Sequence, residues 1–541
     1  MRLIILYVFF LGAISSLFSQ ERAWFYLIAK DTLIQPEFKK INDQLIYIGK
    51  DEQLKKIFGD YIVFEFKKTL RKAKKKNLKR TFFVISNEGK LLQDLLNNTS
   101  HLFEFGEFIT GEDKKIYEPN DYGLTSTIGE NLGLQANLDY LDFLGAPKAW
   151  YYTTGSPDVI IGISDGSVDT TNTDFKGKTK QFRKSNFAKG HGNSQSGSAA
   201  AQGDNGYGIT GLCYDCSIYG TSYGDFRKFD QLLELSKAGV KVINCSWIGR
   251  VYYEKAQSVI DEMFENGTII VASAGNRSWK DTKGKLKYYP SSYNHVISVS
   301  SVMHRYEDVY ENIGYEEKNG NPFASNIRGY VGRSVGFKNN DITKSHHIWP
   351  ISTAILNSEV DILAPTVGLF IYSKFIFNGE IIYNAYETTS GASPFVSGTI
   401  GLMFSLSPCL PVDEVESILK ITATNIDDIE ANKPYYGNYG AGSLNTGRAV
   451  KMVYDMFSPN EIMYIENQKF SRWDFKLTSY SKEVHIRNQK FTDNATLLIK
   501  AKNRIVIGRN TVLRPNIDGK IHLIIDPTLE KQCDLELREG F

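Results

Sequence analysis

The chain has 541 residues, of which 42% are apolar and 23% are charged. These proportions are typical of a globular protein with a large core, and the length favours two to four domains. The formal net charge of +2 argues against a function that depends on overall attraction to nucleic acid or to an anionic membrane, so we expect no nucleic-acid partner.

The first nineteen residues have the pattern of a secretory signal peptide. Arg2 precedes an apolar run over residues 3–11, and small residues follow up to Ser19, after which we expect cleavage. A membrane-anchoring helix is the alternative, but the run is short for spanning a bilayer. No other segment offers the roughly twenty consecutive apolar residues that a span needs. We therefore predict a secreted or extracytoplasmic protein with no stable membrane span.

Five cysteines leave at least one thiol unpaired within a monomer. Cys213 and Cys216 are close enough in sequence for a small local disulfide. Such a CxxC pair also occurs in redox and metal sites, but there is no second pair to support that reading. Cys245, in the apolar run KVINCSW, is expected to be a buried thiol.

Residues 20–117 have the pattern of a small α+β unit. DYIVFEF and RTFFVIS have strand composition, and LLQDLLNN has helical spacing. The basic run at residues 67–80 between the two strands could suggest nucleic-acid binding, but a solvated helix or turn is the simpler explanation.

Between residues 118 and 457, short apolar strands alternate with helical stretches. The strand patterns lie at residues 158–164, 216–223, 240–247, 268–275 and 295–302. Apolar strands alternating with helices predict an α/β fold, in which a mainly parallel sheet is covered by helices on both faces. Residues 304–358 do not follow this alternation of strands and helices, and we expect them to form an insertion with its own local structure. His346 and His347 within it could bind a metal, although solvent exposure is the preferred explanation.

In residues 458–541 apolar and polar residues alternate, as in TLLIKAKNRIVIG and GKIHLIID, and no helical pattern interrupts them. This pattern predicts a small C-terminal all-β module. This tail is similar to short β-stack modules appended to exported bacterial proteins.

Three separated segments carry the parts of a nucleophilic site. A serine hydroxyl needs a base to accept its proton and a third group to orient that base. Asp165 ends an apolar strand, and functional groups gather at such strand ends, although a lone Asp there is more often a cap. His191 lies between two glycines and opens a run of small residues. Ser390 precedes Pro394, which is tolerated early in a helix, so we expect Ser390 at a helix N-terminus or as its N-cap.

Together these segments resemble the signature blocks of the subtilisin-like serine proteases, the subtilase family. The blocks are ISDGSVDTTNTDF, HGNSQSG and TTSGASPFVSG, in the order Asp, His, Ser. VINCSW, VASAGN, YPSSYNHVISVSSV, VDILAPTV and YGAGSLNTGRAV resemble further landmarks of the family, and the similarity covers roughly 330 residues in the middle of the chain.

The resemblance implies a subtilisin-like doubly wound fold and a serine endopeptidase acting on proteins or peptides. Asp165, His191 and Ser390 would form the catalytic triad, and Asn276 would stabilise the oxyanion. It implies two walls of a substrate pocket, which are Ser246, Trp247 and Ile248 on one side and Ala274 and Gly275 on the other. The family usually has glycine at the Ile248 position, so a stiff β-branched side chain there would favour small substrate residues if it points inward.

This sequence departs from the family pattern at several positions. Gly166 and Ser167 replace the usual pair after the aspartate, Ser194 replaces a second histidine, and Gly391 follows the serine. Neither the position of Ser194 nor that of Gly391 supplies the proton-transfer chemistry. The rival interpretations are a catalytically inactive subtilase fold used for binding or scaffolding, and an exported adhesion protein organised by its β-rich tail.

The resemblance also implies that residues 20–117 are a pro-region, which would make the chain a zymogen inhibited by its own N-terminal unit. The mature protein would then begin near residues 118–122. No cofactor is required for this chemistry. Calcium often stabilises the family, but no calcium ligand is mapped onto this sequence.

Overall fold

The computed structural model describes residues 22–539 with several gaps. The gaps are at residues 43, 70–78, 128–131, 186–189, 306–315, 319–320, 324–327, 333, 338–345, 349–353, 373–375, 378 and 385–386. The predicted signal peptide at residues 1–19 and most of the basic run at residues 67–80 therefore lie outside the described residues.

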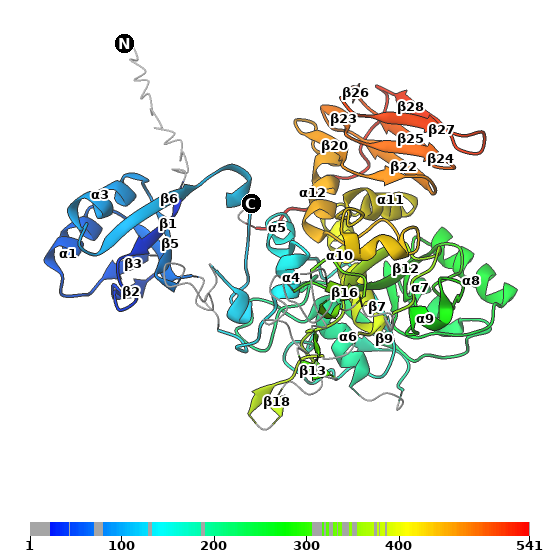
Figure 1. The fold of residues 1–541 in the computed structure, drawn as a ribbon, viewed down its shortest axis with the longest axis horizontal. Coiled ribbons are helices and arrows are strands. Elements are labelled where there is room, and N and C mark those ends of the chain that lie inside the picture. Colours follow the sequence, from blue (N-terminus) through cyan, green and yellow to red (C-terminus); the bar gives the residue numbers. More distant parts are fainter. Residues whose placement is uncertain are drawn as a thin grey trace, which may run out of the picture. The chain divides into compact units, whose positions relative to one another are not determined.

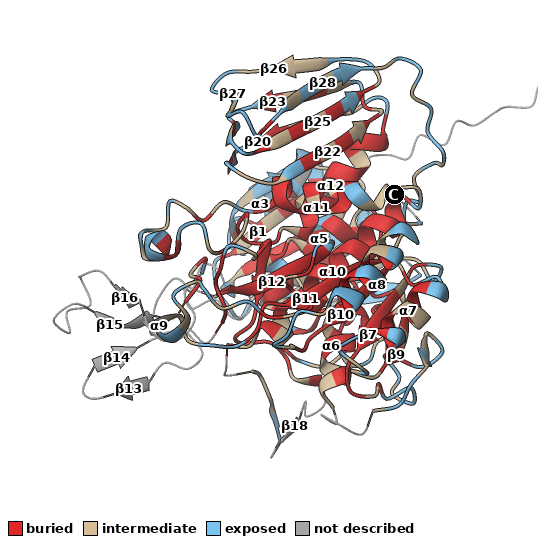
Figure 2. Cartoon of the chain, turned by 90° about the vertical axis from the view of Figure 1, so that its right-hand side faces the viewer, coloured by how far each residue is buried: buried red, intermediate tan, exposed pale blue. Residues whose placement is uncertain are grey.

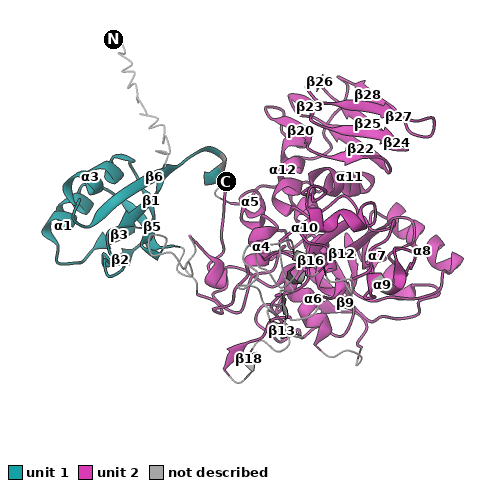
Figure 3. Ribbon diagram, viewed as in Figure 1, with its two compact units in different colours: residues 1–115 teal, residues 116–541 magenta. Residues whose placement is uncertain are grey.

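The chain divides into two compact units, Met1–Lys115 and Ile116–Phe541 (Figure 3). The first unit holds one antiparallel sheet in the order β2-β3-β4-β5-β1-β6. Its strands are β1 (Ala23–Ala29), β2 (Phe38–Ile41), β3 (Gln44–Tyr47), β4 (Val63–Lys68), β5 (Thr81–Ser86) and β6 (Phe103–Ile109). The helices α1 (Glu52–Gly59) and α3 (Lys90–Asn98) bury Leu54, Ile57 and Leu95 against the aromatic core of this sheet. The predicted α+β composition of this segment is confirmed.

The second unit is built on a seven-stranded parallel sheet in the order β17-β12-β11-β10-β7-β9-β8, of which Figure 2 shows the run from β12 to β9. The strands are β7 (Ile160–Ser164), β8 (Thr179–Gln181), β9 (Ser217–Thr221), β10 (Val242–Cys245), β11 (Ile269–Ser273), β12 (Val296–Val302) and β17 (Ile362–Pro365). Every residue of β10, β11 and β12 is buried (Figure 2). Strands buried on both faces need cover on both faces, and their uncharged sequences reflect that requirement.

Helices cover the two faces of this sheet in separate groups. Val242 and Val271 pack in the apolar cluster that contains residues of α6 (His191–Ala200) and α10 (Thr389–Leu406). Their sequence neighbours Ile243 and Ala272 pack with α7 (Asp230–Lys237) and α8 (Glu254–Glu265). Because successive strand residues point to opposite faces, this division confirms the predicted doubly wound α/β architecture.

This unit also contains the short helices α4 (Asp139–Phe143), α5 (Ala146–Trp150) and α9 (Trp279–Thr282). Of two longer helices, α12 (Thr446–Phe457) contacts α10, α11 (Val412–Thr422) contacts α12, and both contact the C-terminal strands. Two short antiparallel pairs lie within the predicted insertion: β13 (Glu316–Lys318) with β14 (Asn321–Phe323), and β15 (Ser334–Phe337) with β16 (His346–Ile348). His346 and His347 lie in β16, but their side chains are outside the described part of the chain.

The C-terminal segment is all-β, as predicted, and its strands stack in parallel as a three-sided coil (Figure 1). The three sides are β20 (Ile462–Glu466), β23 (Glu483–Arg487) and β26 (Ile505–Ile507); β21 (Lys469–Phe470), β24 (Lys490–Asp493) and β27 (Val512–Pro515); and β22 (Asp474–Ser479), β25 (Thr496–Ala501) and β28 (Ile521–Ile525). Asn467 and Asn488, 21 residues apart, bond side chain to side chain at 2.7 Å where one turn of the coil lies on the next.

Two disulfides are present. The local bond between Cys213 and Cys216 is confirmed, as is the buried free thiol of Cys245. The second disulfide joins Cys409 to Cys533, across 124 residues. It links the C-terminal part of the chain covalently to the segment that follows α10. No helix in the described part of the chain has the length and apolar character to cross a membrane.

Candidate active site

Asp165 follows β7 directly at the carboxyl end of the parallel sheet. Its N–H donates to the carbonyl of Thr221 at 2.9 Å, which continues the pairing of β7 with β9 and fixes the backbone. A Cβ atom on Gly192 would lie 2.0 Å from the carbonyl oxygen of Gly166, so only glycine permits this approach. The turn after Asp165 therefore packs directly against the first turn of α6.

That close approach brings His191, the first residue of α6, to the carboxylate of Asp165. The Nδ1 atom of His191 lies 2.8 and 2.9 Å from Oδ1 and Oδ2 of Asp165, and the carboxylate is fully buried. A carboxylate only accepts hydrogen bonds, so Nδ1 carries the hydrogen and Nε2 of neutral His191 keeps its lone pair. Tyr223 donates its hydroxyl hydrogen to Oδ1 at 3.2 Å, which gives the aspartate a further donor.

The contact between Asp165 and His191 also shifts the pKa of the imidazole. Burial disfavours the charged form of His191, but the hydrogen bond to Asp165 and the negative charge of Asp165 outweigh burial and raise the pKa of His191 above its ordinary value of 6.5. General base catalysis is most effective when the pKa of the base lies near the operating pH, and a raised pKa moves His191 in that direction from its ordinary, mildly acidic value.

This shift predicts the acid limb of the pH profile. Only neutral His191 can accept a proton, so kcat/KM for peptide hydrolysis should fall as the pH drops through a midpoint above 6.5. Steady-state kinetics across the acidic and neutral range measures that midpoint directly. A profile that stays flat down through pH 6.5 would contradict the assignment of His191 as the base.

Ser390 is the second residue of α10, as the sequence predicted for a helix N-terminus. Pro394 has no N–H to donate to the carbonyl of Ser390 four residues earlier, so that carbonyl has no partner within the helix. Ser246, which follows β10, supplies the missing donor through its hydroxyl at 3.0 Å. This bond ties the start of α10 to the end of β10.

In this structure Ser390 and His191 each contact a residue other than the other. Oγ of Ser390 donates to the carbonyl oxygen of Ser246 at 3.3 Å, and Nε2 of His191 lies 3.3 Å from Nε2 of Gln195. Within the described residues, no hydrogen bond joins Ser390 to His191. Catalytic hydrogen bonds often tighten only when substrate binds, so their absence from this structure does not exclude a pairing of the two side chains.

Asn276 lies just beyond β11 and is exposed. Its Oδ1 accepts from the N–H of Thr389 at 2.8 Å and from the Thr389 hydroxyl at 3.1 Å. Because the acceptor side of the amide is held by the residue before Ser390, the Nδ2 hydrogens remain available to an acceptor from solvent.

The five predicted pocket residues follow two neighbouring parallel strands. Ser246, Trp247 and Ile248 come after β10, and Ala274 and Gly275 come after β11, so the two segments lie side by side. The indole N–H of Trp247 donates to the carbonyl of Ser164 at 3.0 Å, which directs this side chain toward β7. The side chain of Ile248 points toward the other segment, because its Cγ2 lies 3.4 Å from the position of a Cβ on Gly275.

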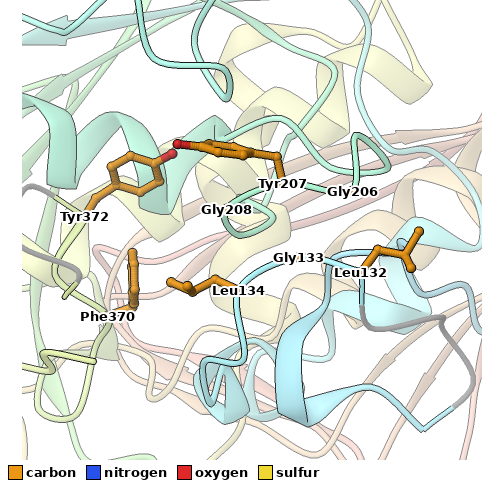
Figure 4. Close-up of a pocket in the computed structure, with 8 residues that line it drawn as sticks. All are labelled: Leu132, Gly133, Leu134, Gly206, Tyr207, Gly208, Phe370 and Tyr372. Atoms are coloured by element: carbon orange, nitrogen blue, oxygen red, sulfur yellow. The ribbon is translucent and has the colours of Figure 1, made fainter. Parts of the chain in front are cut away.

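A separate cavity of about 220 Å³ contains none of these residues (Figure 4). Its lining is mainly glycine and apolar or aromatic side chains: Leu132, Gly133, Leu134, Gly206, Tyr207, Gly208, Phe370 and Tyr372. Across the described ranges, no three His, Cys, Asp or Glu side chains are grouped so that they could hold a metal ion. Calcium ligands therefore stay unassigned.

In this fold an Asp–His pair and a serine at a helix N-terminus lie beyond the carboxyl edge of a parallel α/β sheet. This arrangement is typical of the serine hydrolases. The model of the subtilase family matches residues 156–442, more than half of the chain. The chain belongs to the subtilase family and is a serine-type endopeptidase.

Characterised relatives agree with this assignment. The chain is similar to subtilisin DY of Bacillus licheniformis, with 26% identity over 306 residues that cover 54% of this chain and 91% of the relative. It is also similar to fervidolysin of Fervidobacterium pennivorans, with 25% identity over 57% of this chain but only 43% of the relative. The crystal structure of fervidolysin aligns at 17% identity over 80% of this chain and 61% of that chain; its TM-score of 0.41 is too low to add to the assignment.

Two contacts of the site had no signal in the sequence. Tyr223 lies within a strand-like stretch, and nothing local links its hydroxyl to Asp165, 58 residues earlier. Gln195 is one helical turn after His191, but its proximity to Nε2 depends on how α6 packs.

Proposed function

We propose that this chain is a secreted endopeptidase in which Asp165, His191 and Ser390 act as a catalytic triad. The observation that carries the proposal is the pair of short contacts from the buried Asp165 carboxylate to Nδ1 of His191. These contacts select the tautomer in which Nε2 is free to accept the serine proton.

The reaction starts when Ser390 rotates from the carbonyl of Ser246 toward His191. As Oγ attacks the scissile carbonyl carbon, Nε2 of His191 takes its proton and Asp165 stabilises the resulting imidazolium. His191 then gives that proton to the departing amine, which leaves an acyl group on Ser390. Water, deprotonated by His191 in the same way, attacks the acyl carbon and frees the carboxyl product with restoration of the serine.

Two donors are available to the tetrahedral oxyanion. Ser390 is in the first turn of α10, where backbone N–H groups have no partner within the helix. The Nδ2 group of Asn276 is the second donor, and its amide is oriented in advance by Thr389. Donors fixed before the reaction stabilise developing charge without a reorganisation cost.

Replacing Asn276 with alanine should lower kcat on the order of a hundredfold or more and leave KM nearly unchanged, because the donor acts only as charge develops. This scale is carried over from the loss of the equivalent donor in subtilisin. Initial-rate kinetics on one peptide substrate separates the two parameters. A raised KM at an unchanged kcat would instead make Asn276 a ground-state binding residue.

We also propose export through the segment at residues 1–19 and synthesis as a zymogen, with residues 20–117 as the pro-region. The boundary between the two compact units, at Lys115 and Ile116, supports a junction near the predicted start of the mature chain. A separately folded N-terminal unit is what an intramolecular inhibitor and folding aid requires.

If maturation is autocatalytic, the Ser390→Ala variant should accumulate with the pro-region attached, whereas the wild-type protein loses it. Intact-mass measurement of both purified proteins distinguishes these forms. A normal mature N-terminus in the variant would mean that another protease makes the cut.

A further inference from the structure

A third segment of the chain contacts one of the two predicted pocket walls. Gly275 has a left-handed φ of +106°, and a Cβ placed on it would lie 2.4 Å from Cδ2 and 2.9 Å from Cε2 of Tyr288. The same Cβ would lie 3.4 Å from Cγ2 of Ile248. The ring of Tyr288 and the side chain of Ile248 therefore both reach the glycine that directly precedes Asn276.

Tyr288 is held firmly in this position. Its side chain is 3% exposed and packs in one apolar cluster with Ala274 and Ile248. The next residue, Tyr289, exchanges two backbone hydrogen bonds with Gly249, which directly follows Ile248. The carbonyl of Tyr288 accepts from the Ser291 hydroxyl at 2.9 Å and from the Ser292 N–H at 3.0 Å. These bonds fix the backbone directly after the ring.

The reacting atoms locate the substrate side chain that meets this ring. The scissile carbonyl carbon must come within about 3 Å of Oγ of Ser390, with its oxygen toward Nδ2 of Asn276. The residue that contributes this carbonyl carries its side chain on the adjacent carbon atom. That side chain must therefore enter close to Gly275, the residue before Asn276, which the ring of Tyr288 and the side chain of Ile248 both reach.

We propose that Tyr288 and Ile248 together fill the primary substrate pocket, so that the enzyme cleaves after glycine or alanine and excludes large apolar residues. This inference rests on the proposed function and names the substrate class of the same site. Ile248 is stiff at χ1, and the ring of Tyr288 cannot leave without breaking the packing of its cluster. Tyr288 is thus a specificity-determining residue that the sequence analysis did not identify.

The test is a peptide library varied only at the residue before the cut, applied to protein produced from the full-length chain after intact-mass measurement has verified that residues 20–117 are released. The wild type should favour glycine and alanine over phenylalanine and leucine. Tyr288→Gly and Ile248→Gly should each raise the ratio of kcat/KM for leucine over alanine by roughly ten- to two-hundredfold, the usual scale of apolar discrimination. Tyr288→Phe keeps the ring and is the matched control, so its preference should remain that of the wild type.

The possible results distinguish an error in the pocket proposal from an error in the proposed function. Efficient wild-type cleavage after phenylalanine, or an unchanged profile in Ile248→Gly, would overturn the filled pocket while leaving the endopeptidase intact. Ile248→Gly decides the matter alone if Tyr288→Gly does not fold. If the wild type neither cleaves any library member nor reacts with a fluorophosphonate, the proposed function itself fails, and the inference fails with it.

Discussion

Replacing Ser390 with alanine should lower kcat/KM for peptide hydrolysis by several orders of magnitude while the folded structure is retained. The variant lacks Oγ, the atom that would form the covalent bond to the substrate. The fold should be retained because Oγ makes only a long hydrogen bond, of 3.3 Å, to the carbonyl of Ser246. The scale is that of nucleophile removal in subtilisin. Hydrolysis assays, with circular dichroism to verify folding, measure both parts of this expectation.

A double variant sharpens this prediction. His191→Ala should be as damaging as Ser390→Ala, and the combination should cost little more than either change alone, because the two side chains act as one unit. Ser405→Ala is a matched control on the same helix, since its hydroxyl bonds only to the carbonyl of Gly401 and to the sulfur of Cys216. Additive losses in the double variant would show that Ser390 and His191 work independently.

Replacing Asp165 with asparagine should lower kcat/KM by about 10⁴-fold, even though the two side chains have nearly the same shape. An amide can donate to Nδ1 of His191, which then places the hydrogen on Nε2 and blocks the base. Loss of the negative charge also removes the interaction that raises the pKa of His191. The remaining activity should therefore show an acid limb at lower pH than the wild type.

Tyr223→Phe is the matched control for Asp165→Asn. It removes one hydrogen bond to the same charged carboxylate, of the order of 1.5–3 kcal/mol, and should lower kcat/KM by roughly ten- to a hundredfold. An Asp165→Asn variant with activity close to that of Tyr223→Phe would contradict an orienting and charge-stabilising role for the aspartate.

The main features of the fold and the positions of the site residues could be predicted from local sequence patterns. The uncharged strand ending at Ser164 placed Asp165 at a sheet edge, and the early proline placed Ser390 in the first turn of a helix. These features depend on a few neighbouring residues and on the general geometry of parallel sheets. They therefore appear in the sequence itself.

The contacts that complete the site depend on packing between distant segments. Tyr288 reaches Gly275 only because the loop carrying it pairs with Gly249, 40 residues earlier in the chain. The sequence suggested a restricted pocket through Ile248 alone, and left open whether that side chain turns inward. In the same way, the bond of Ser390 to Ser246 joins residues 144 positions apart, and no local pattern encodes it.

The C-terminal module shows a similar limit. Alternating residues indicated strands, but alternation does not distinguish antiparallel hairpins from a parallel coil. The strand partners lie one turn of the coil apart, as Phe470 pairs with Phe491 and Phe491 with Leu513. The disulfide from Cys409 to Cys533 was likewise unassigned, because pairing across such a distance requires the folded positions of both ends.

The most direct test of a serine activated by Asp165 and His191 is covalent labelling with a fluorophosphonate, followed by mass spectrometry of the modified peptide. An inactive subtilase fold used only for binding would retain the serine but not its reactivity. We predict that the adduct lies on Ser390 and that labelling is abolished in both Ser390→Ala and His191→Ala. Absence of labelling in the wild type, or an adduct on another residue, would contradict the central claim.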